Sequence, residues 1–303
     1  MFSRFTLYFD EVVRSGSIRR ASERLNISPS AIDRHILLME ETLGVQLFER
    51  MPQGLRLTAA GEVLITHVRR WRRELRHARA QIDDLRGLRR GEVTIALVEG
   101  VSEFLASALV EFRVQYPGID HSVQVTGAQG VVDLILEGRA ELGLTFNPPT
   151  VQTVRVERTI VYQLGAVVPP GHPLAGRAEV SFPECVDHGL VIPDESISLR
   201  AVLDTMWART IGGRVRGAIT ANGIGLLKVL VRRGAGVGML TPIDIGGELE
   251  AGELVFVPLA EANVPLSVLS LITAGGRTLS VPASLLVQHI AQMMRDTGAG
   301  GIG

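Results

Sequence analysis

The sequence predicts two structural classes in one chain: an all-α amino-terminal module that continues into a long helix, and a carboxy-terminal α/β domain. Apolar residues recur at helical spacing from Ile18 to Leu85, whereas short β-branched runs alternate with helical segments from Val93 onward. The charge divides at the same place. Residues 1–90 carry 17 Arg, no Lys and 11 acidic residues, and residues 91–303 carry 14 basic and 21 acidic residues. A basic module (+6) joined to an acidic body (−7) is typical of a nucleic-acid-binding end on a non-binding body.

Two helices separated by a short turn are expected in residues 17–43. Ser17 is a suitable N-cap for the first helix, and Asn26-Ile27 forms the turn. The second helix begins with Ser28 as N-cap and Pro29 at its first position, and ends at Gly44. Its expected buried stripe is Ile32, Ile36, Met39 and Leu43. Its opposite face presents Ser30, Asp33, Arg34 and Leu37.

A small β wing is expected after the second helix. Arg50 and Arg56 flank Met51-Pro52-Gln53-Gly54, a turn-forming segment that indicates the tip of the wing. The three parts together form a winged helix-turn-helix. The alternative is an amphipathic helical pair with no role on DNA.

This segment resembles the DNA-binding domain of the LysR-type transcriptional regulators. The matching residues are Phe9, Gly16-Ser17, Ala21, Leu25, Ser28, Ala31, Arg34, Ile36, Glu40, Leu43-Gly44-Val45, Leu47-Phe48-Glu49-Arg50, Leu57-Thr58 and Ala60-Gly61. Pro29-Ser30, Asp33 and Leu37-Leu38 differ from residues common in the family, so the resemblance does not imply an operator sequence.

The resemblance implies double-stranded DNA as a partner, with the second helix in the major groove. Arg34 and Ser30 are expected to reach base edges, Asp33 to accept from a cytosine amine, and Leu37 to touch a thymine methyl. The residues expected to hold phosphates or to enter the minor groove are Ser28, Arg50, Gln53 and Arg56. Ser17 and Pro29, at the two helix starts, complete the expected DNA-binding set.

A long helix capped by Thr58 should follow the wing. Its apolar residues step by 4 and 3 in alternation, which is a heptad seam: Leu64, Val68, Trp71, Leu75, Ala78, Ile82 and Leu85. The seam is too narrow for a core helix, so a partner helix is expected to cover it. Packing against the chain's own body is the alternative. In LysR-type regulators this linker pairs with that of a second subunit, which implies a homodimer or homotetramer.

The remaining residues predict a mostly parallel, doubly wound sheet. A hinge is expected at Gly87–Gly91. The expected strands are 93–97, 123–126, 142–146, 161–169, 190–192, 215–219, 237–240 and 268–272. The expected helices are 102–116, 130–137, 223–233 and 282–294, and residues 298–303 are expected to fray.

This order resembles the effector domain of the same family, which has the periplasmic-binding-protein fold of two Rossmann-like lobes. The local matches are 136–144, 171–174 and 234–242. The resemblance implies a DNA-binding domain at 1–58, a linker at 59–90 and an effector domain at 91–303. Within the effector domain, lobe I covers about 91–163 and 268–297, and lobe II about 164–267.

Ligands of open α/β sheets bind beyond the carboxyl ends of the strands, near helix N-termini. The candidates here are Glu99, Gly100, Ser102, Thr126, Gly127, Gln129, Phe146, Asn147, Pro193, Ser196, Ser198, Asn222 and Gly223. Their hydroxyls, amides and N–H groups suit a small polar or anionic molecule, whereas the Glu99 carboxylate disfavours an anion and suits an amine. Ordinary capping of helices by Thr126, Ser196 and Asn222 is the alternative.

Other functional classes find little support. The seven histidines form no metal-ligand spacing, and we find no nucleophile elbow or Walker A loop, so neither an enzyme nor a cofactor or metal is expected. A single cysteine, Cys185, excludes an internal disulfide and is expected to be a buried small hydrophobe. With neither a signal-peptide pattern nor a long apolar run, we expect a cytoplasmic protein rather than a secreted solute-binding protein or a membrane protein. A regulator whose effector domain only mediates oligomerisation remains an alternative.

Overall fold

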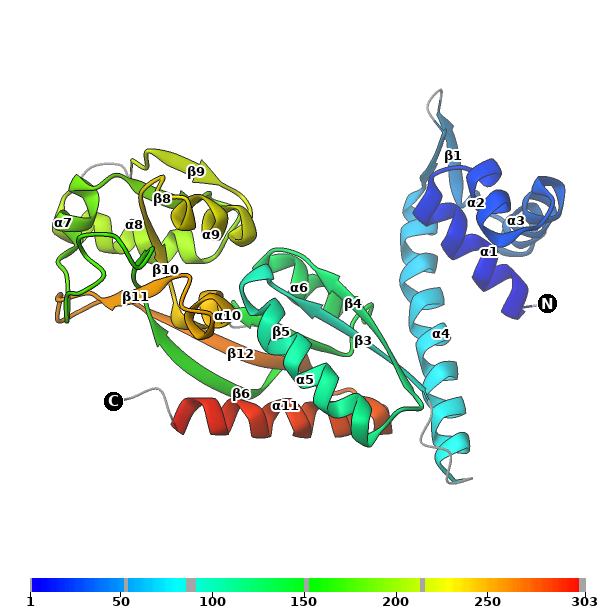
Figure 1. Cartoon of the computed structure of the whole chain (residues 1–303). Helices are drawn as coiled ribbons and strands as arrows, with labels where there is room; N and C mark the ends of the chain where they lie inside the picture. The colour runs from blue at the N-terminus through cyan, green and yellow to red at the C-terminus, as the bar shows by residue number, and fades with distance from the viewer. Residues whose placement is uncertain (1, 52–53, 86–90, 150–152, 213–215, 300–303) are drawn as a thin grey trace. The chain divides into compact units, whose positions relative to one another are not determined.

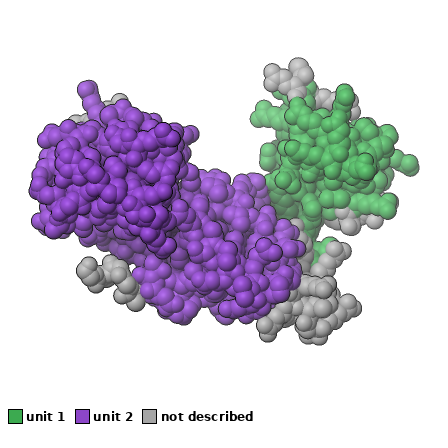
Figure 2. All heavy atoms as spheres, viewed as in Figure 1, with its two compact units in different colours: residues 1–82 green, residues 83–303 purple. Residues whose placement is uncertain are grey.

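The computed structural model describes residues 2–51, 54–85, 91–149, 153–212 and 216–299, in two compact units, Met1–Ile82 and Asp83–Gly303 (Figures 1 and 2). Four of the predicted features lie partly or wholly outside these residues: Gln53 at the wing tip, the hinge before Gly91, the strand start at Val215, and the tail 300–303.

The first unit is a helical head with a two-stranded wing and a long helix (Figure 1). Its elements are α1 (Phe2–Ser15), α2 (Ile18–Leu25), α3 (Pro29–Leu43), β1 (Phe48–Met51), β2 (Gly54–Leu57) and α4 (Ala59–Leu85). The core is built by the fully buried side chains of Phe5, Phe9, Val12, Ala21 and Ile32, together with Leu47 and Val68. Helix α1 is not among the predicted elements, because its apolar residues have helical spacing but no capping residue marks its start.

Leu43 corrects the predicted stripe of α3. Ile32 and Ile36 are buried and Met39 packs partly against the core, but Leu43 is 46% exposed. It lies in the last turn of α3, where Gly44 adopts a left-handed conformation (φ +67°) and the chain turns away. The stripe therefore covers two helical turns and not three.

In the second unit, one five-stranded sheet has the order β4-β3-β5-β12-β6. The strands are β3 (Gly91–Leu97), β4 (Ile119–Val125), β5 (Leu142–Phe146), β6 (Val154–Gln163) and β12 (Leu266–Ala274). Val93, Ile95 and Leu97 face α5 (Ser102–Gln115) and α11 (Val281–Ala299), whereas Ala96 packs with α6 (Ala128–Leu136). The alternation of side chains along β3 thus gives both faces of the sheet a helical cover.

The other five-stranded sheet has the order β11-β7-β10-β8-β9. Its strands are β7 (Gly165–Val168), β8 (Leu190–Pro193), β9 (Ile219–Ala221), β10 (Val237–Leu240) and β11 (Val255–Pro258). Its helices are α7 (Phe182–Asp187), α8 (Leu199–Thr210) and α9 (Ile224–Arg232), and α10 (Gly246–Glu250) follows β10. Two short 3-10 turns complete the unit, η1 (Glu99–Val101) and η2 (Pro242–Ile245). Only β12 in the first sheet and β7 in the second run antiparallel to both neighbours among the described strands.

Four predicted elements of this unit are wrong in extent. The strand predicted at 123–126 is β4, which begins at Ile119. The single strand 161–169 is two strands, β6 and β7, which belong to different sheets and meet at Leu164. A Cβ at Gly165 would lie 2.3 Å from the Phe256 ring, so this glycine lets β7 pack closely against β11. The sixth strand begins at Ile219, and α11 continues through Gly298 to Ala299 where fraying was expected.

Candidate functional site

Helix α3 presents a polar face to solvent in the first unit. Ser30, Arg34 and Leu37 are exposed and Asp33 is half-buried, on the side opposite Ile32 and Ile36. Pro29 occupies the first position of the helix, and Ser28 precedes it with its hydroxyl accepting from that of Ser30 at 3.3 Å. The face that was predicted to meet base edges is thus available to a ligand.

The wing is fixed to the helices by local hydrogen bonds. The Glu40 carboxylate on α3 accepts from the backbone N–H groups of Leu47 (2.7 Å) and Phe48 (3.3 Å). Thr58 caps α4 by accepting from Gly61 N–H at 3.0 Å, as predicted. Leu55 N–H donates to Gly16 O at 2.9 Å, which ties β2 to the corner between α1 and α2. The backbone that carries the exposed Arg56 side chain is therefore anchored to the helices. The Arg50 side chain and Gln53 lie outside the described residues.

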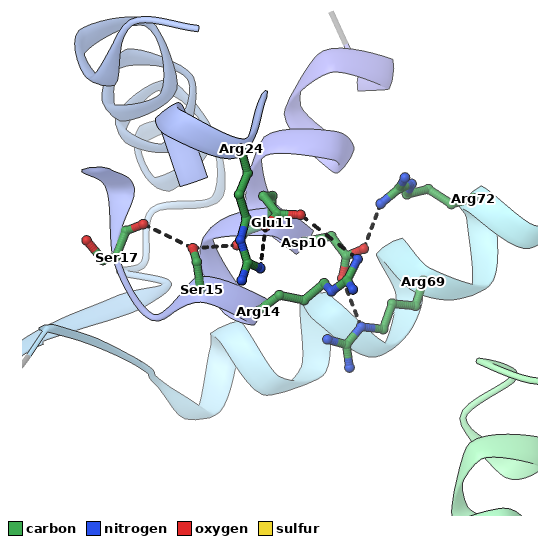
Figure 3. Close-up of polar contacts among 8 residues, drawn as sticks. All are labelled: Asp10, Glu11, Arg14, Ser15, Ser17, Arg24, Arg69 and Arg72. Atoms are coloured by element: carbon green, nitrogen blue, oxygen red, sulfur yellow. Dashed lines mark hydrogen bonds and ion pairs between the residues drawn. The ribbon is translucent and has the colours of Figure 1, made fainter. Parts of the chain in front are cut away.

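An acidic residue of α1 holds the long helix α4 (Figure 3). The Asp10 carboxylate accepts from Arg69 Nε at 3.0 Å and from Arg72 Nη1 at 2.6 Å. Glu11 beside it pairs with Arg24 at 3.2 Å. Ser17, predicted to meet DNA, lies at this corner, where its carbonyl accepts from the Ser15 hydroxyl at 3.1 Å. Arg69 and Arg72 of this basic module thus pair with an acid of the same module and join α4 to α1.

The predicted seam of α4 divides into two parts. Val68 is fully buried in the core of the head and Leu64 packs partly against it. Trp71 and Leu75 are 40% and 49% exposed. The side chains of Ala78, Ile82 and Leu85 lie outside the described residues. The amino-terminal part of the seam is therefore covered by the chain itself, which was the alternative reading, and the next part is open.

A cavity of about 260 Å³ lies in the second unit between the carboxyl ends of strands from both sheets. Eight of the predicted effector residues line it: Glu99, Gly100, Thr126, Gly127, Phe146, Ser196, Ser198 and Asn222. Apolar side chains complete much of the wall, among them Val98, Ile197 and Ile224. The structure thus brings together residues that are as far apart as Glu99 and Asn222 in the sequence.

Five predicted effector residues do not line the cavity. Ser102 and Gln129 are engaged within their own helices, since Ser102 Oγ donates to Glu99 O (2.6 Å) and Gln129 Nε2 to Asp133 (2.9 Å). Asn147 turns to accept from Val268 N–H at 2.9 Å, which joins the ends of β5 and β12. Pro193 ends β8, and Gly223 is the N-cap of α9.

Thr126, Ser196 and Asn222 line the cavity without occupying helix N-cap positions, whereas Ser198, also in the lining, is the N-cap of α8. Gly127 and Gly223, not Thr126 and Asn222, occupy the N-cap positions of α6 and α9. The Ser196 hydroxyl donates to Asp194 at 2.6 Å and caps no helix.

Asp244 is a lining residue that the sequence prediction missed. It is 5% exposed, and its Oδ2 accepts from the Thr241 N–H (2.8 Å) and hydroxyl (2.7 Å). Burial raises the pKa of this carboxyl to about 6, although the Thr241 hydrogen bonds and the Lys228 charge lower it. A capping box, Thr241-x-x-Asp244, directly after a buried strand was the signal that marks this residue.

Glu99 crosses the cavity. Its two carboxylate oxygens accept from Ile224 N–H at 2.8 Å and from Gly225 N–H at 3.0 Å, which are the first two amides of α9. Glu99 lies on η1 beside one sheet and α9 packs on the other sheet. This residue therefore links the two lobes directly.

Cysteine and metal chemistry find no support among the described residues. Cys185 is fully buried, and burial raises the pKa of its thiol to about 12, as expected for a small hydrophobe. No group of three or more His, Cys, Asp or Glu in these residues is arranged to hold a metal ion. No helix in the described ranges is long and apolar enough to cross a membrane.

Comparison with known proteins accounts for both units. Residues 4–62 match the model of the bacterial regulatory helix-turn-helix protein, LysR family, and residues 86–295 match the LysR substrate binding domain. The RuBisCO operon transcriptional regulator of Allochromatium vinosum is 28% identical over 247 residues, which are 82% of each chain.

Solved structures show the same fold. Full-length OxyR from Pseudomonas aeruginosa superposes with a TM-score of 0.70 and 17% identity, over 97% of this chain and 94% of that one. Full-length CbnR in complex with its target DNA gives a TM-score of 0.67 and 20% identity, over 96% and 99%. With the helix-turn-helix and substrate-binding models spanning both units, the chain belongs to the LysR family of transcriptional regulators and is not an enzyme.

Proposed function

We propose that the chain binds a specific DNA sequence through α3 and the wing. The observation that carries this is the exposed face of Ser30, Arg34 and Leu37, backed by a buried stripe and held to the wing through Glu40. In this proposal Arg34 donates two hydrogen bonds to a guanine and Arg56 holds a phosphate. Residues 1–58 form the DNA-binding domain in this assignment.

Selection from a pool of random DNA duplexes tests this proposal. Full-length protein is expected to enrich a motif of two half-sites about one helical turn apart, because one helix-turn-helix contacts too few bases for specificity. The matched control is the Arg34→Ala variant, which is expected to retain DNA without enriching the motif. Failure of the wild-type protein to enrich any sequence would contradict sequence-specific binding.

We infer that the linker, residues 59–90, pairs with its counterpart in a second subunit. Trp71 and Leu75 support this, because these two large apolar side chains, four residues apart on the predicted seam, are 40% and 49% exposed. The double variant Trp71→Glu, Leu75→Glu is expected to sediment as a smaller species than wild type. Val63→Glu, at an exposed position off the seam on the same helix, serves as the control.

We further propose that residues 91–303 bind a small-molecule effector in the cavity, and that its binding shifts the closure of the two lobes. The cavity lined by Thr126, Ser196 and Asn222 supports this, because none of these three polar residues occupies a helix N-cap position. A thermal-shift screen against common metabolites tests it, since a ligand at 100 times its dissociation constant adds roughly 2.7 kcal/mol. Silence across the screen would favour the alternative, an effector domain that only mediates oligomerisation.

A further inference from the structure

The N-terminus of α9 at the cavity already binds a carboxylate of the protein itself. A helix N-terminus attracts anions, because its first N–H groups lack partners and carry partial positive charge. In α9, a nine-residue helix, Glu99 accepts from the first two of these groups. A Cβ at Gly225 would lie 3.2 Å from Glu99 Oε1, so the glycine leaves room for this carboxylate.

Asp244 places a second carboxylate at the same cavity. Both hydrogen bonds that hold it end on Oδ2, and within the described part of the chain Oδ1 accepts none. Oδ1 lies against Gly100, where a Cβ would approach it to 2.0 Å, and both residues line the cavity. A side chain that is only 5% exposed thus keeps one carboxylate oxygen at the cavity wall, as an acceptor for the donor of a bound ligand.

The described residues that line the cavity include no Arg, Lys or His to balance these two acids. Lys228, the only lysine in the sequence, lies one turn further along α9 and is not part of the lining. Its Nζ is held outside by Glu103 at 3.0 Å and by Glu248 at 2.8 Å. The walls that remain are apolar or carry neutral hydroxyls and amides.

We propose that the effector is a small organic cation, whose protonated amine or amidinium donates to Asp244 Oδ1 and Glu99 while its apolar part packs beside Phe146 and Ile224. This rests on the proposed function of the cavity as the effector site. Charge-assisted hydrogen bonds of this kind favour a cation, whereas a carboxylate or phosphate effector would meet two acids and a helix end that is already occupied.

Thermal unfolding of the full-length protein with matched compounds tests the charge of the ligand. The probes are butylamine with butyrate, 1,4-diaminobutane with succinate, and benzylamine with benzoate, at pH 7.5 and constant ionic strength. At least one amine is expected to raise Tm with a saturable dependence on concentration, and its matched acid is not.

Two isosteric variants identify the groups. Asp244→Asn keeps an oxygen for Thr241 and is expected to weaken amine binding about tenfold or more, because it removes one charged acceptor. Glu99→Gln is expected to weaken the amine and to allow the matched acid to bind. Asp204→Asn, on α8 and outside the cavity, is the control and is expected to bind like wild type.

Three results would overturn the proposal: a shift by an acid without its amine, an amine shift that Asp244→Asn leaves unchanged, or silence of all six probes. If an acid raised Tm without its amine and Asn222→Ala abolished that shift, the cavity would still be the effector site. Only the assignment of a cationic effector would then fail. Enrichment of a DNA motif does not depend on the cavity. A protein that enriches a motif and ignores the probes would therefore still be a sequence-specific regulator.

Discussion

The helix-turn-helix head and the cavity between the two five-stranded sheets use acidic residues in opposite ways. In the head, the Asp10 carboxylate pairs with Arg69 and Arg72 (Figure 3). Arg34 on α3 is exposed. In the cavity, Asp244 faces the open space, while Lys228 is held outside it by two glutamates. In the head an acid is paired within the protein and a cation is exposed. At the cavity the cation is paired within the protein and an acid lines the wall.

The difference teaches that ligand charge is better inferred from unpaired groups than from net charge. The head is basic by composition, but two of its arginines are structural and only the outward ones can meet phosphates. The helix end in the cavity would suit an anion, but Glu99 fills it. Substitutions that change one partner at a time separate these two arrangements.

The largest effect is expected for Asp244→Asn as a function of pH. The folded-state pKa of about 6 lies above the ordinary value of 3.8, so the fold favours the protonated form. The contribution of this carboxyl to the free energy of unfolding is greatest below about pH 4, where it is protonated in both states. That contribution is lost as pH rises through 6, because ionisation is disfavoured in the folded state. The free energy of unfolding of wild type relative to the variant is expected to fall by about 3 kcal/mol between pH 4 and pH 7.5, measured by urea unfolding.

The groups that face Asp244 are Lys228, which favours its ionised form, and Tyr162, whose own pKa is raised to about 12 by burial and by the Asp244 charge. Neither group titrates between pH 4 and 7.5, so the change in stability over this range is assigned to the Asp244 carboxyl. A difference between wild type and Asp244→Asn that stays flat with pH would show that Asp244 is ionised throughout.

The next largest effect is expected for Arg34→Ala at the selected DNA site. Loss of a side chain that contacts a base edge should weaken binding by about 1–3 kcal/mol and flatten the preference at one base position. Fluorescence anisotropy with the selected duplex and with single-base variants of it measures both. Equal weakening on every duplex would instead assign Arg34 to the phosphate backbone.

A smaller loss is expected for Asp10→Asn, in stability and not in DNA contact. The variant weakens two hydrogen bonds to half-buried arginines, which should lower the stability of the head by about 1–2 kcal/mol. Faster hydrogen exchange in α1 and α4 measures the loss. Glu23→Gln, which removes an exposed pair with Arg19 on α2, should leave exchange unchanged.

Local patterns were enough to predict much of the head and could not predict how the cavity is linked. The caps at Ser28 and Thr58 and the stripe at Ile32 and Ile36 depend on neighbours within a few residues, and these elements form where the sequence placed them. The contact of Glu99 with Ile224 spans 125 residues, and no periodicity encodes it. For the same reason the apolar run 161–169 did not indicate that the chain passes from one sheet to the other at Leu164.

The smallest effect, and the sharpest test of the division within the head, is expected for Arg56→Ala. Its exposed guanidinium rises from β2, whose base is tied to Gly16, so its proposed partner is a phosphate of either strand and not a particular base. Releasing one phosphate contact should reduce the salt dependence of log K by about 0.9 and weaken all duplexes by about 1 kcal/mol or less. Anisotropy titrations from 50 to 200 mM salt measure the slope. Loss of the selected site alone, with other duplexes bound normally, would place Arg56 at a base edge, and the wing as well as α3 would then determine the operator.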